Sequence, residues 1–128
     1  MESEQECREE YDGHLASVPD PETNYFLVSL MSTNAFIGGY QSPDDHWHWT
    51  DGSFMDYTNW FTGHPDNNGG RENYMEIFYY YGRGFWNDMT NKHKQPGYHG
   101  FICQVEKSCG STCEGYKFNP FLLFPNDD

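Results

Sequence analysis

Residues 3–33 are predicted to contain two helices, and the second of them has its hydrophobic positions at a helical spacing. Residues 3–12 are predicted to form a helix, because the acidic side chains in its first turn interact favourably with the positive end of the helix dipole. Gly13 follows as a C-terminal stop, and residues 14–18 form a short extended link. Asp20 and Pro21 then supply an N-cap and a first helical residue. This second helix is predicted to end near Thr33 and to carry one apolar face, made of Phe26, Leu27, Leu30 and Met31.

After the second helix the spacing changes to a period of two, which is typical of strands. Residues 35–40 are predicted to form a strand. The next segment alternates, with Trp47 and Trp49 on one face and His46 and His48 on the other, before a turn at Asp51 and Gly52. Three more strands are predicted over residues 73–81, 84–89 and 99–106. Two helices followed by several short strands indicate an α+β domain.

Between residues 53 and 72 lies a loop of about twenty residues, a length that is uncommon without a functional reason. Its last part and the residue after it, "HPDNNGGREN" from His64 to Asn73, hold two carboxylates, three amides, one imidazole and two glycines. Oxygen-bearing side chains therefore gather between two aromatic segments that are predicted to be core.

The chain has 128 residues, a formal net charge of -13 and an aromatic share of 19%. Its length indicates one domain, and the charge argues against binding nucleic acid or anionic lipid. No apolar run is long enough to cross a membrane. The N-terminal "MESEQECREE" is not a signal peptide, so either the protein is cytosolic or the chain is a piece of a secreted protein.

Four cysteines, Cys7, Cys103, Cys109 and Cys113, permit three pairings. None has the spacing of a structural zinc site, and the sequence alone does not choose among the pairings.

Several motifs occur in the order of a known family. They are "CREEYDGHLASVPDPETNYFL" from Cys7, "FIGG" from Phe36, "WHWTDGS" from Trp47, "YTNW" from Tyr57, "WND" from Trp86 and "FIC" from Phe101. Together they resemble a C-type lectin-like domain over residues 1–106, with residues 107–128 as a tail, a linker or the start of another domain. The resemblance implies the fold of that family: two helices, short antiparallel strands and a long calcium and ligand loop.

The resemblance also implies a function, which is calcium-dependent binding of glycans or glycoproteins outside the cell, without enzymatic activity. The implied Ca²⁺ ligands are Asp66, Glu72, Asn87 and Asp88, and the implied sugar contacts are His64, Asp66, Glu72 and Asn87. Pro65 corresponds to a proline that is cis in calcium-loaded members. The resemblance further implies a disulfide between Cys7 and Cys103.

The chemistry of these residues favours a hard cation independently of the resemblance. Ca²⁺ takes six to eight oxygen ligands, which carboxylates and an amide can supply. A divalent ion also relieves the repulsion among three carboxylates that meet at one point. His64 departs from the family, whose sugar-binding members have Glu or Gln there, and an imidazole nitrogen is a poor calcium ligand.

Other interpretations remain open at this stage. Many domains of this fold bind no calcium, so the "WND" residues can be purely structural, and the chain can be a calcium-independent protein-binding domain. His46 and His48 can form a zinc site. Asn67, Glu72 and Asn73 can contribute to a second calcium site.

Two further departures concern the framework. The second disulfide of the family is missing at Tyr74 and about Asn91. The family strand that precedes the first helix and pairs with the last strand is also missing. The last strand is therefore expected to have an exposed edge, which proteins usually avoid, unless the tail provides a surrogate strand.

Overall fold

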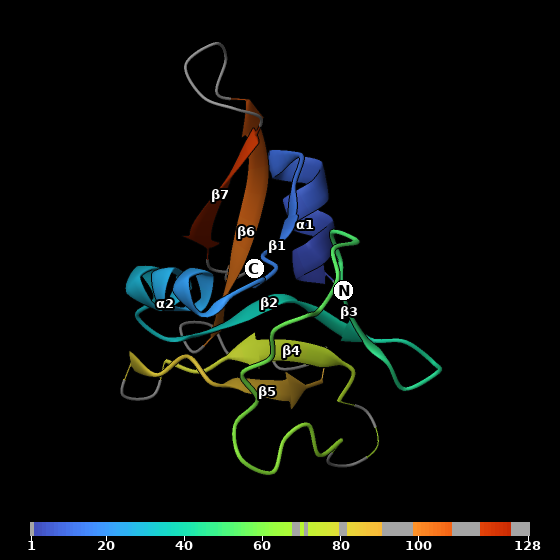
Figure 1. The fold of residues 1–128 in the computed structure, drawn as a ribbon. Helices are drawn as coiled ribbons and strands as arrows, with labels where there is room; N and C mark the ends of the chain where they lie inside the picture. The colour runs from blue at the N-terminus through green and yellow to red at the C-terminus, as the bar shows by residue number, and fades with distance from the viewer. Residues whose placement is uncertain are drawn as a thin grey trace.

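Among the described residues, seven strands form one mixed sheet with two helices beside it (Figure 1). The structure is a computed structural model, and it describes residues 2–67, 70, 72–79, 82–90, 99–108 and 116–123. The elements in chain order are α1 Glu2–Tyr11, β1 His14–Leu15, α2 Pro21–Leu30, β2 Asn34–Gln41, β3 Trp47–Trp49, β4 Tyr74–Ile77, β5 Trp86–Met89, β6 His99–Ser108 and β7 Tyr116–Leu123. Two helices followed mainly by strands confirm the predicted fold class.

The sheet has the order β1-β6-β2-β4-β5, with β3 paired to β2 and β7 paired to β6. The pairings are antiparallel except that of β2 with β6, which is parallel. The alternating segments therefore became strands as predicted, but the parallel pair makes the sheet mixed. Strands β4 and β5 lie together, and the long loop, drawn in green, runs out beside them (Figure 1).

Strand β7 comes from the C-terminal tail and covers the edge of β6 that was expected to be open. Cys103 pairs with Leu15 of β1 and with Phe121 of β7, so these two strands lie on opposite edges of β6. The pairing with β7 runs from Phe101 to Ser108. Of the three roles left open for the tail, this segment takes that of a surrogate strand, which removes an unpaired edge.

Helix α2 begins as predicted, because the Asp20 side chain accepts a hydrogen bond from the Thr23 N–H at 2.7 Å and Pro21 follows it. Its buried face agrees with the prediction in part. Leu27 and the C-cap residue Met31 are buried as expected, Leu30 is partly buried, and Phe26 is 48% exposed. The helix also buries Asn24 and Val28, which were not predicted.

The buried face of α2 was hard to predict from the sequence because it includes a polar residue, Asn24. Its side chain is buried because it donates to the Gly84 carbonyl at 3.0 Å and accepts from the Trp86 indole N–H at 2.8 Å. Both partners are more than fifty residues away in the chain, so no local pattern could reveal them.

The core is built around Trp49 and Trp86, whose rings meet edge to face with centroids 5.4 Å apart. Aliphatic residues of α2, β2 and β4 complete this cluster. A second buried cluster surrounds the Cys7–Cys103 disulfide and includes Leu15, Phe36 and Phe101. The disulfide ties α1 to β6, as the resemblance implied.

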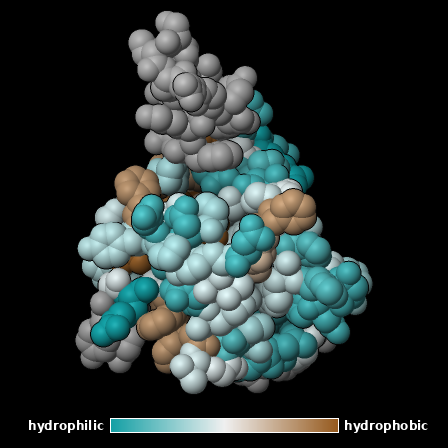
Figure 2. Space-filling view, viewed as in Figure 1, coloured by the Kyte–Doolittle hydropathy of each residue, from teal (hydrophilic) through white to brown (hydrophobic). Residues whose placement is uncertain are grey.

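Hydrophilic residues dominate the face of the molecule shown in Figure 2, and hydrophobic residues form only small separate patches there. Within the described residues, neither helix is long and apolar enough to cross a membrane.

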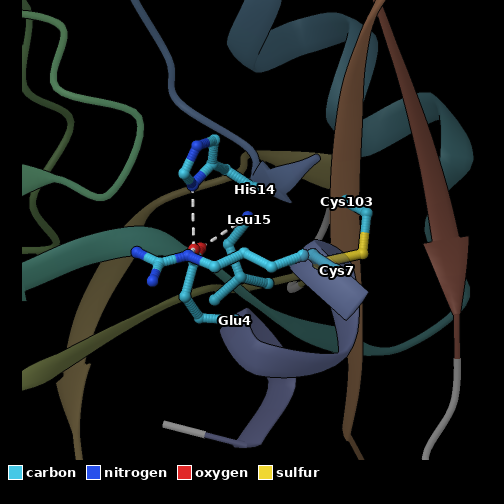
Figure 3. Close-up of a disulfide and its surroundings, with 6 residues drawn as sticks. Glu4, Cys7, His14, Leu15 and Cys103 are labelled. Atoms are coloured by element: carbon cyan, nitrogen blue, oxygen red, sulfur yellow. Dashed lines mark hydrogen bonds and ion pairs between the residues drawn. A yellow bond between two sulfur atoms is a disulfide. The ribbon is translucent and has the colours of Figure 1, made fainter. Parts of the chain in front are cut away.

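Glu4 of α1 is a buried acid that joins this helix to β1 next to the disulfide (Figure 3). Its carboxylate accepts hydrogen bonds from the Leu15 N–H at 2.9 Å, from His14 Nδ1 at 2.8 Å and from Arg8 Nε. Burial acts to raise the pKa of Glu4, but these hydrogen bonds outweigh it and hold the pKa below its ordinary value. The fold therefore favours the ionised form of Glu4.

Because the pKa of Glu4 is lower in the folded than in the unfolded protein, Glu4 stabilises the fold above its unfolded pKa. That contribution is lost as pH falls through the folded pKa. At about pH 7, Glu4→Gln is expected to lower the free energy of unfolding by about 1–3 kcal/mol, the usual contribution of hydrogen bonds to a charged group. Towards about pH 3 the variant and the wild type should converge.

Chemical denaturation at these two pH values measures the effect. Glu10→Gln, an exposed position on the same helix, serves as the matched control and should behave as the wild type. An equal loss of stability on acidification in Glu4→Gln and in the wild type would show that Glu4 does not carry this dependence.

Candidate functional site

Backbone hydrogen bonds to β5 fix the long loop on the sheet. The Trp86 N–H donates to the Asn59 carbonyl and the Phe61 N–H donates to the Trp86 carbonyl, both at 2.9 Å. The Asn59 side chain also donates to the Gly84 carbonyl at 2.8 Å. Since Asp88 follows Trp86 on the same strand, these bonds hold the next part of the loop close to Asp88.

The structure brings three of the predicted site residues together. The ligand atoms of His64, Asp66 and Asp88 all lie within 4.8 Å of one another. His64 Nδ1 is 3.2 Å from an Asp88 carboxylate oxygen and 3.6 Å from an Asp66 carboxylate oxygen. The His64–Pro65 peptide bond is cis. We call these three residues the loop cluster.

Asp88 is the buried centre of the loop cluster, with a side chain that is 0% exposed. One of its oxygens accepts from the Asp66 N–H at 3.1 Å, and the other accepts from the Asn67 N–H at 2.6 Å. The Asp88 carboxylate therefore fixes the loop backbone and supplies negative charge at the same point.

Asn87 precedes Asp88 on β5, and its amide is directed toward β4. Its Nδ2 donates to a carboxylate oxygen of Glu76 at 3.1 Å, and Glu76 is the residue paired with it across the two strands. Its Oδ1 is buried and has no hydrogen-bond partner among the described residues. An amide oxygen in this state is an acceptor without a donor, which is costly in a protein interior.

Glu72 is not part of the loop cluster. Its backbone N–H donates to the Asn67 side-chain oxygen at 3.1 Å, which draws the end of the loop back toward its start. Asn67 itself has a positive φ of 48°, a conformation that asparagine tolerates better than most residues. The turn at Asn67 therefore serves both Asp88 and Glu72.

Sequence reasoning did not identify Glu76, the buried acid that binds the Asn87 amide. The signal was available, since strand alternation in "YMEI" places Glu76 on the face opposite to Met75 and Ile77. A hairpin register between the "YMEI" and "WNDM" segments would have placed it opposite Asn87.

The proposed zinc site at His46 and His48 gains no support from the described residues. His48 Nε2 lies 2.9 Å from the Ser42 hydroxyl and thus has a hydrogen-bond partner. The loop cluster is the one group of three or more His, Cys, Asp or Glu side chains in metal-binding proximity within the part of the chain that the structure describes. His48 lies in β3 opposite Tyr40 of β2, and His46 lies in the turn just before this strand.

The sequence model of the family described as Lectin C-type domain matches residues 1–105. The chain belongs to this family. It is 35% identical over 111 residues to a protein named Lectin from Pleurodeles waltl, a match that covers 80% of this chain and 62% of that protein. The chain thus spans less than two thirds of the length of that relative.

Solved structures agree with the assignment to the C-type lectin domains. The C-type lectin CEL-I from Cucumaria echinata superposes with a TM-score of 0.64 and 27% identity, covering 70% of this chain and 72% of that one. A calcium-independent type II antifreeze protein superposes with a TM-score of 0.62 and 27% identity, covering 69% and 66%. C-type lectin-like domains are a non-enzymatic binding fold, so the chain is a binding domain. The antifreeze neighbour is described as calcium-independent.

Proposed function

We propose that this domain is an extracellular module that binds glycans or glycoproteins through a calcium ion at the end of the long loop. The observation that carries the proposal is the loop cluster, in which carboxylate oxygens of Asp66 and the buried Asp88 lie within 4.8 Å of each other and of His64 Nδ1. The Cys7–Cys103 disulfide supports an oxidising compartment.

The donor set fits calcium in part. Ca²⁺ prefers oxygen ligands, and Asp66, Asp88 and the unpaired amide oxygen of Asn87 are oxygens of the right kind. Glu72, at the end of the same loop, is proposed as a further ligand. When bound, the ion would supply coordination positions for two neighbouring sugar hydroxyls. Around it, the chain's own carboxylates accept hydrogen bonds from those hydroxyls and its amides donate to their oxygens.

A second candidate function is calcium-independent binding of a protein. It is favoured by one specific observation: both Asp88 oxygens already accept backbone hydrogen bonds from the loop, so the loop is held on the sheet by protein groups alone. In this alternative the loop cluster is structural, and the long loop is a rigid surface for a partner.

Calcium dependence of the melting temperature is the first test. Ca²⁺ at a hundredfold excess over its dissociation constant is expected to stabilise the fold by about 2.7 kcal/mol, and chelator should reverse the shift. Asp66→Asn is expected to reduce the shift. Asp56→Asn, which removes an exposed carboxylate from the same loop outside the loop cluster, should leave it unchanged. A glycan array with and without chelator then tests sugar binding, and a melting temperature that ignores calcium would favour the protein-binding alternative.

His64 is the residue that fits calcium least, because its imidazole nitrogen is a poor ligand for this ion. His64→Gln replaces that nitrogen by an amide oxygen. It is therefore expected to raise calcium affinity by about tenfold, equivalent to about 1.4 kcal/mol, and to strengthen sugar binding. Isothermal titration calorimetry measures the first effect. Unchanged affinity in His64→Gln would place His64 outside the coordination sphere.

A further inference from the structure

A cavity of about 430 Å³ opens on a different part of the domain from the loop cluster and shares no residue with it. It is formed by the segment before α2, by α2 itself, by the turn after β3, and by Gln104 of β6 and Pro120 of β7. The volume lies within the usual range for ligand pockets. Pro120 is outside residues 1–105, which match the family, so the tail of this chain completes the cavity.

The lining of this cavity is acidic on one side and apolar on the other. Three carboxylates, those of Asp20, Glu22 and Asp51, line it, and none of its described lining residues is Lys, Arg or His. The apolar side includes Phe26, Leu27, Pro19 and Pro120. The charge and the apolar wall together select an occupant that is both cationic and partly hydrophobic.

Asp51 supplies fixed charge rather than free hydrogen-bond acceptors. One oxygen accepts from the Ser17 hydroxyl at 2.6 Å and from the Gln104 amide at 2.8 Å, and the other accepts from the Ser53 N–H at 2.9 Å and its hydroxyl at 2.6 Å. Burial acts to raise the pKa of Asp51, but these bonds hold it below the ordinary value. Four accepted bonds use the capacity of a carboxylate.

Direct contacts to an occupant are therefore left to Asp20 and Glu22 at the start of α2. Asp20 caps the helix by accepting from the Thr23 N–H, and the Thr23 side chain also hydrogen-bonds to it. Glu22 lies in the first helical turn and is exposed. Phe26, one turn further along the helix, is 48% exposed and presents part of its ring to the same cavity.

We propose that this cavity binds an arginine side chain presented by a partner protein. A guanidinium group is always charged, donates to carboxylates in its own plane and stacks on aromatic rings. Its aliphatic stem packs against apolar groups such as Pro19 and Pro120. The three carboxylates match its charge, and Phe26 matches its flat face.

A surrounding protein surface, rather than a free small molecule, is indicated by a neighbouring aromatic residue. Phe54 directly follows Ser53, which lines the cavity, and is 86% exposed. Aromatic and arginine side chains are the usual anchors at the centres of protein interfaces. A partner that inserts arginine into the cavity would also cover Phe54.

The test is an NMR titration of the full chain, labelled with ¹⁵N, in buffer that contains chelator. The probe is the peptide acetyl-Gly-Arg-Gly-amide, and the matched control replaces arginine by citrulline, which has a similar shape without the charge. Saturable shifts are expected at residues of α2 and of the turn at 51–53 with the arginine peptide alone. Because chelator removes calcium, failure of the calcium proposal leaves this experiment unaffected.

Variants test which residues of the cavity bind the arginine peptide. The double variant Asp20→Asn with Glu22→Gln keeps a capping residue but removes two charges, and it is expected to weaken the arginine peptide at least about tenfold. Phe26→Ala should also weaken it. Two controls should bind as the wild type: Tyr25→Ala, 75% exposed on the same helix and not part of the lining, and Glu10→Gln on α1. The inference is overturned by the absence of shifts, by equal shifts with citrulline, or by equal losses in Glu10→Gln.

Discussion

Removing the Cys7–Cys103 disulfide is expected to lower the free energy of unfolding by about 4–5 kcal/mol, because the bond closes a loop of nearly the whole family-matched domain. The two residues are separated by 96 positions, and the loop-entropy estimate for about a hundred residues is near 4.7 kcal/mol. Both residues are 0% exposed, so the bond also lies within a packed cluster that joins α1 to β6.

The double variant Cys7→Ala with Cys103→Ala, compared with the oxidised wild type by guanidinium denaturation, measures this loss. Wild-type protein unfolded in the presence of a reductant is the control that removes the cross-link without changing the side-chain volume. Peptide mapping without reduction should recover the Cys7 and Cys103 peptides linked to each other. A loss of unfolding free energy below about 1 kcal/mol would contradict the expected stabilisation by this disulfide. A Cys7 peptide linked to another cysteine would contradict the Cys7–Cys103 pairing itself.

The helix starts and the strand segments were predictable because their signals are local. Asp20 and Pro21 define the start of α2 through one hydrogen bond and one fixed dihedral, and the alternation around Trp47 and Trp49 defines β3. The buried face of α2 was predicted only in part: Leu27 and Met31 are buried as expected, but Phe26 is 48% exposed. Asn24 was missed, since its burial depends on Gly84 and Trp86. Polar residues buried by distant partners carry no local signal.

The same physical limit explains what was missed elsewhere. Glu4 belongs to a run of acidic residues that is typical of a solvent-exposed helix face. It is nevertheless only 8% exposed, because its carboxylate accepts hydrogen bonds from the Leu15 N–H and from two basic side chains. The tail is a different case, because its partner β6 is the preceding strand in the chain. The sequence left the role of the tail open, and residues 116–123 pair with β6.

The residues of the loop cluster were predicted from the resemblance to family motifs, because the hydrophobic periodicity of the sequence does not indicate them. His64, Asp66 and Asp88 are more than twenty positions apart at their extremes, and the loop's hydrogen bonds to Trp86 and Asp88 bring them together. That Asp66, Glu72, Asn87 and Asp88 bind one cation stays a prediction. The Asn87 amide donates to Glu76 and to the Met89 sulfur, and the Glu72 N–H donates to Asn67.

Asp88 is expected to have two separable roles, and its substitution should have the largest effect on the loop. Without calcium it accepts hydrogen bonds from the Asp66 and Asn67 N–H groups. Asp88→Ala removes both acceptors of these part-buried bonds, and a hydrogen bond to a charged group contributes about 1.5–3 kcal/mol. The variant should therefore be less stable than the wild type even in chelator, and its calcium-dependent shift in melting temperature should vanish.

Asp88→Asn separates these two roles. An asparagine at this position retains one oxygen acceptor of nearly the same shape but no charge, so it is expected to lose less stability than alanine in chelator. It should still lose most of the calcium-dependent shift, because a neutral amide replaces the buried carboxylate. Stability in chelator and the calcium-dependent shift are measured for wild type, Asp88→Ala and Asp88→Asn. If Asp88→Asn keeps the full shift while Asp88→Ala is strongly destabilised, Asp88 serves the loop backbone alone and is not a calcium ligand.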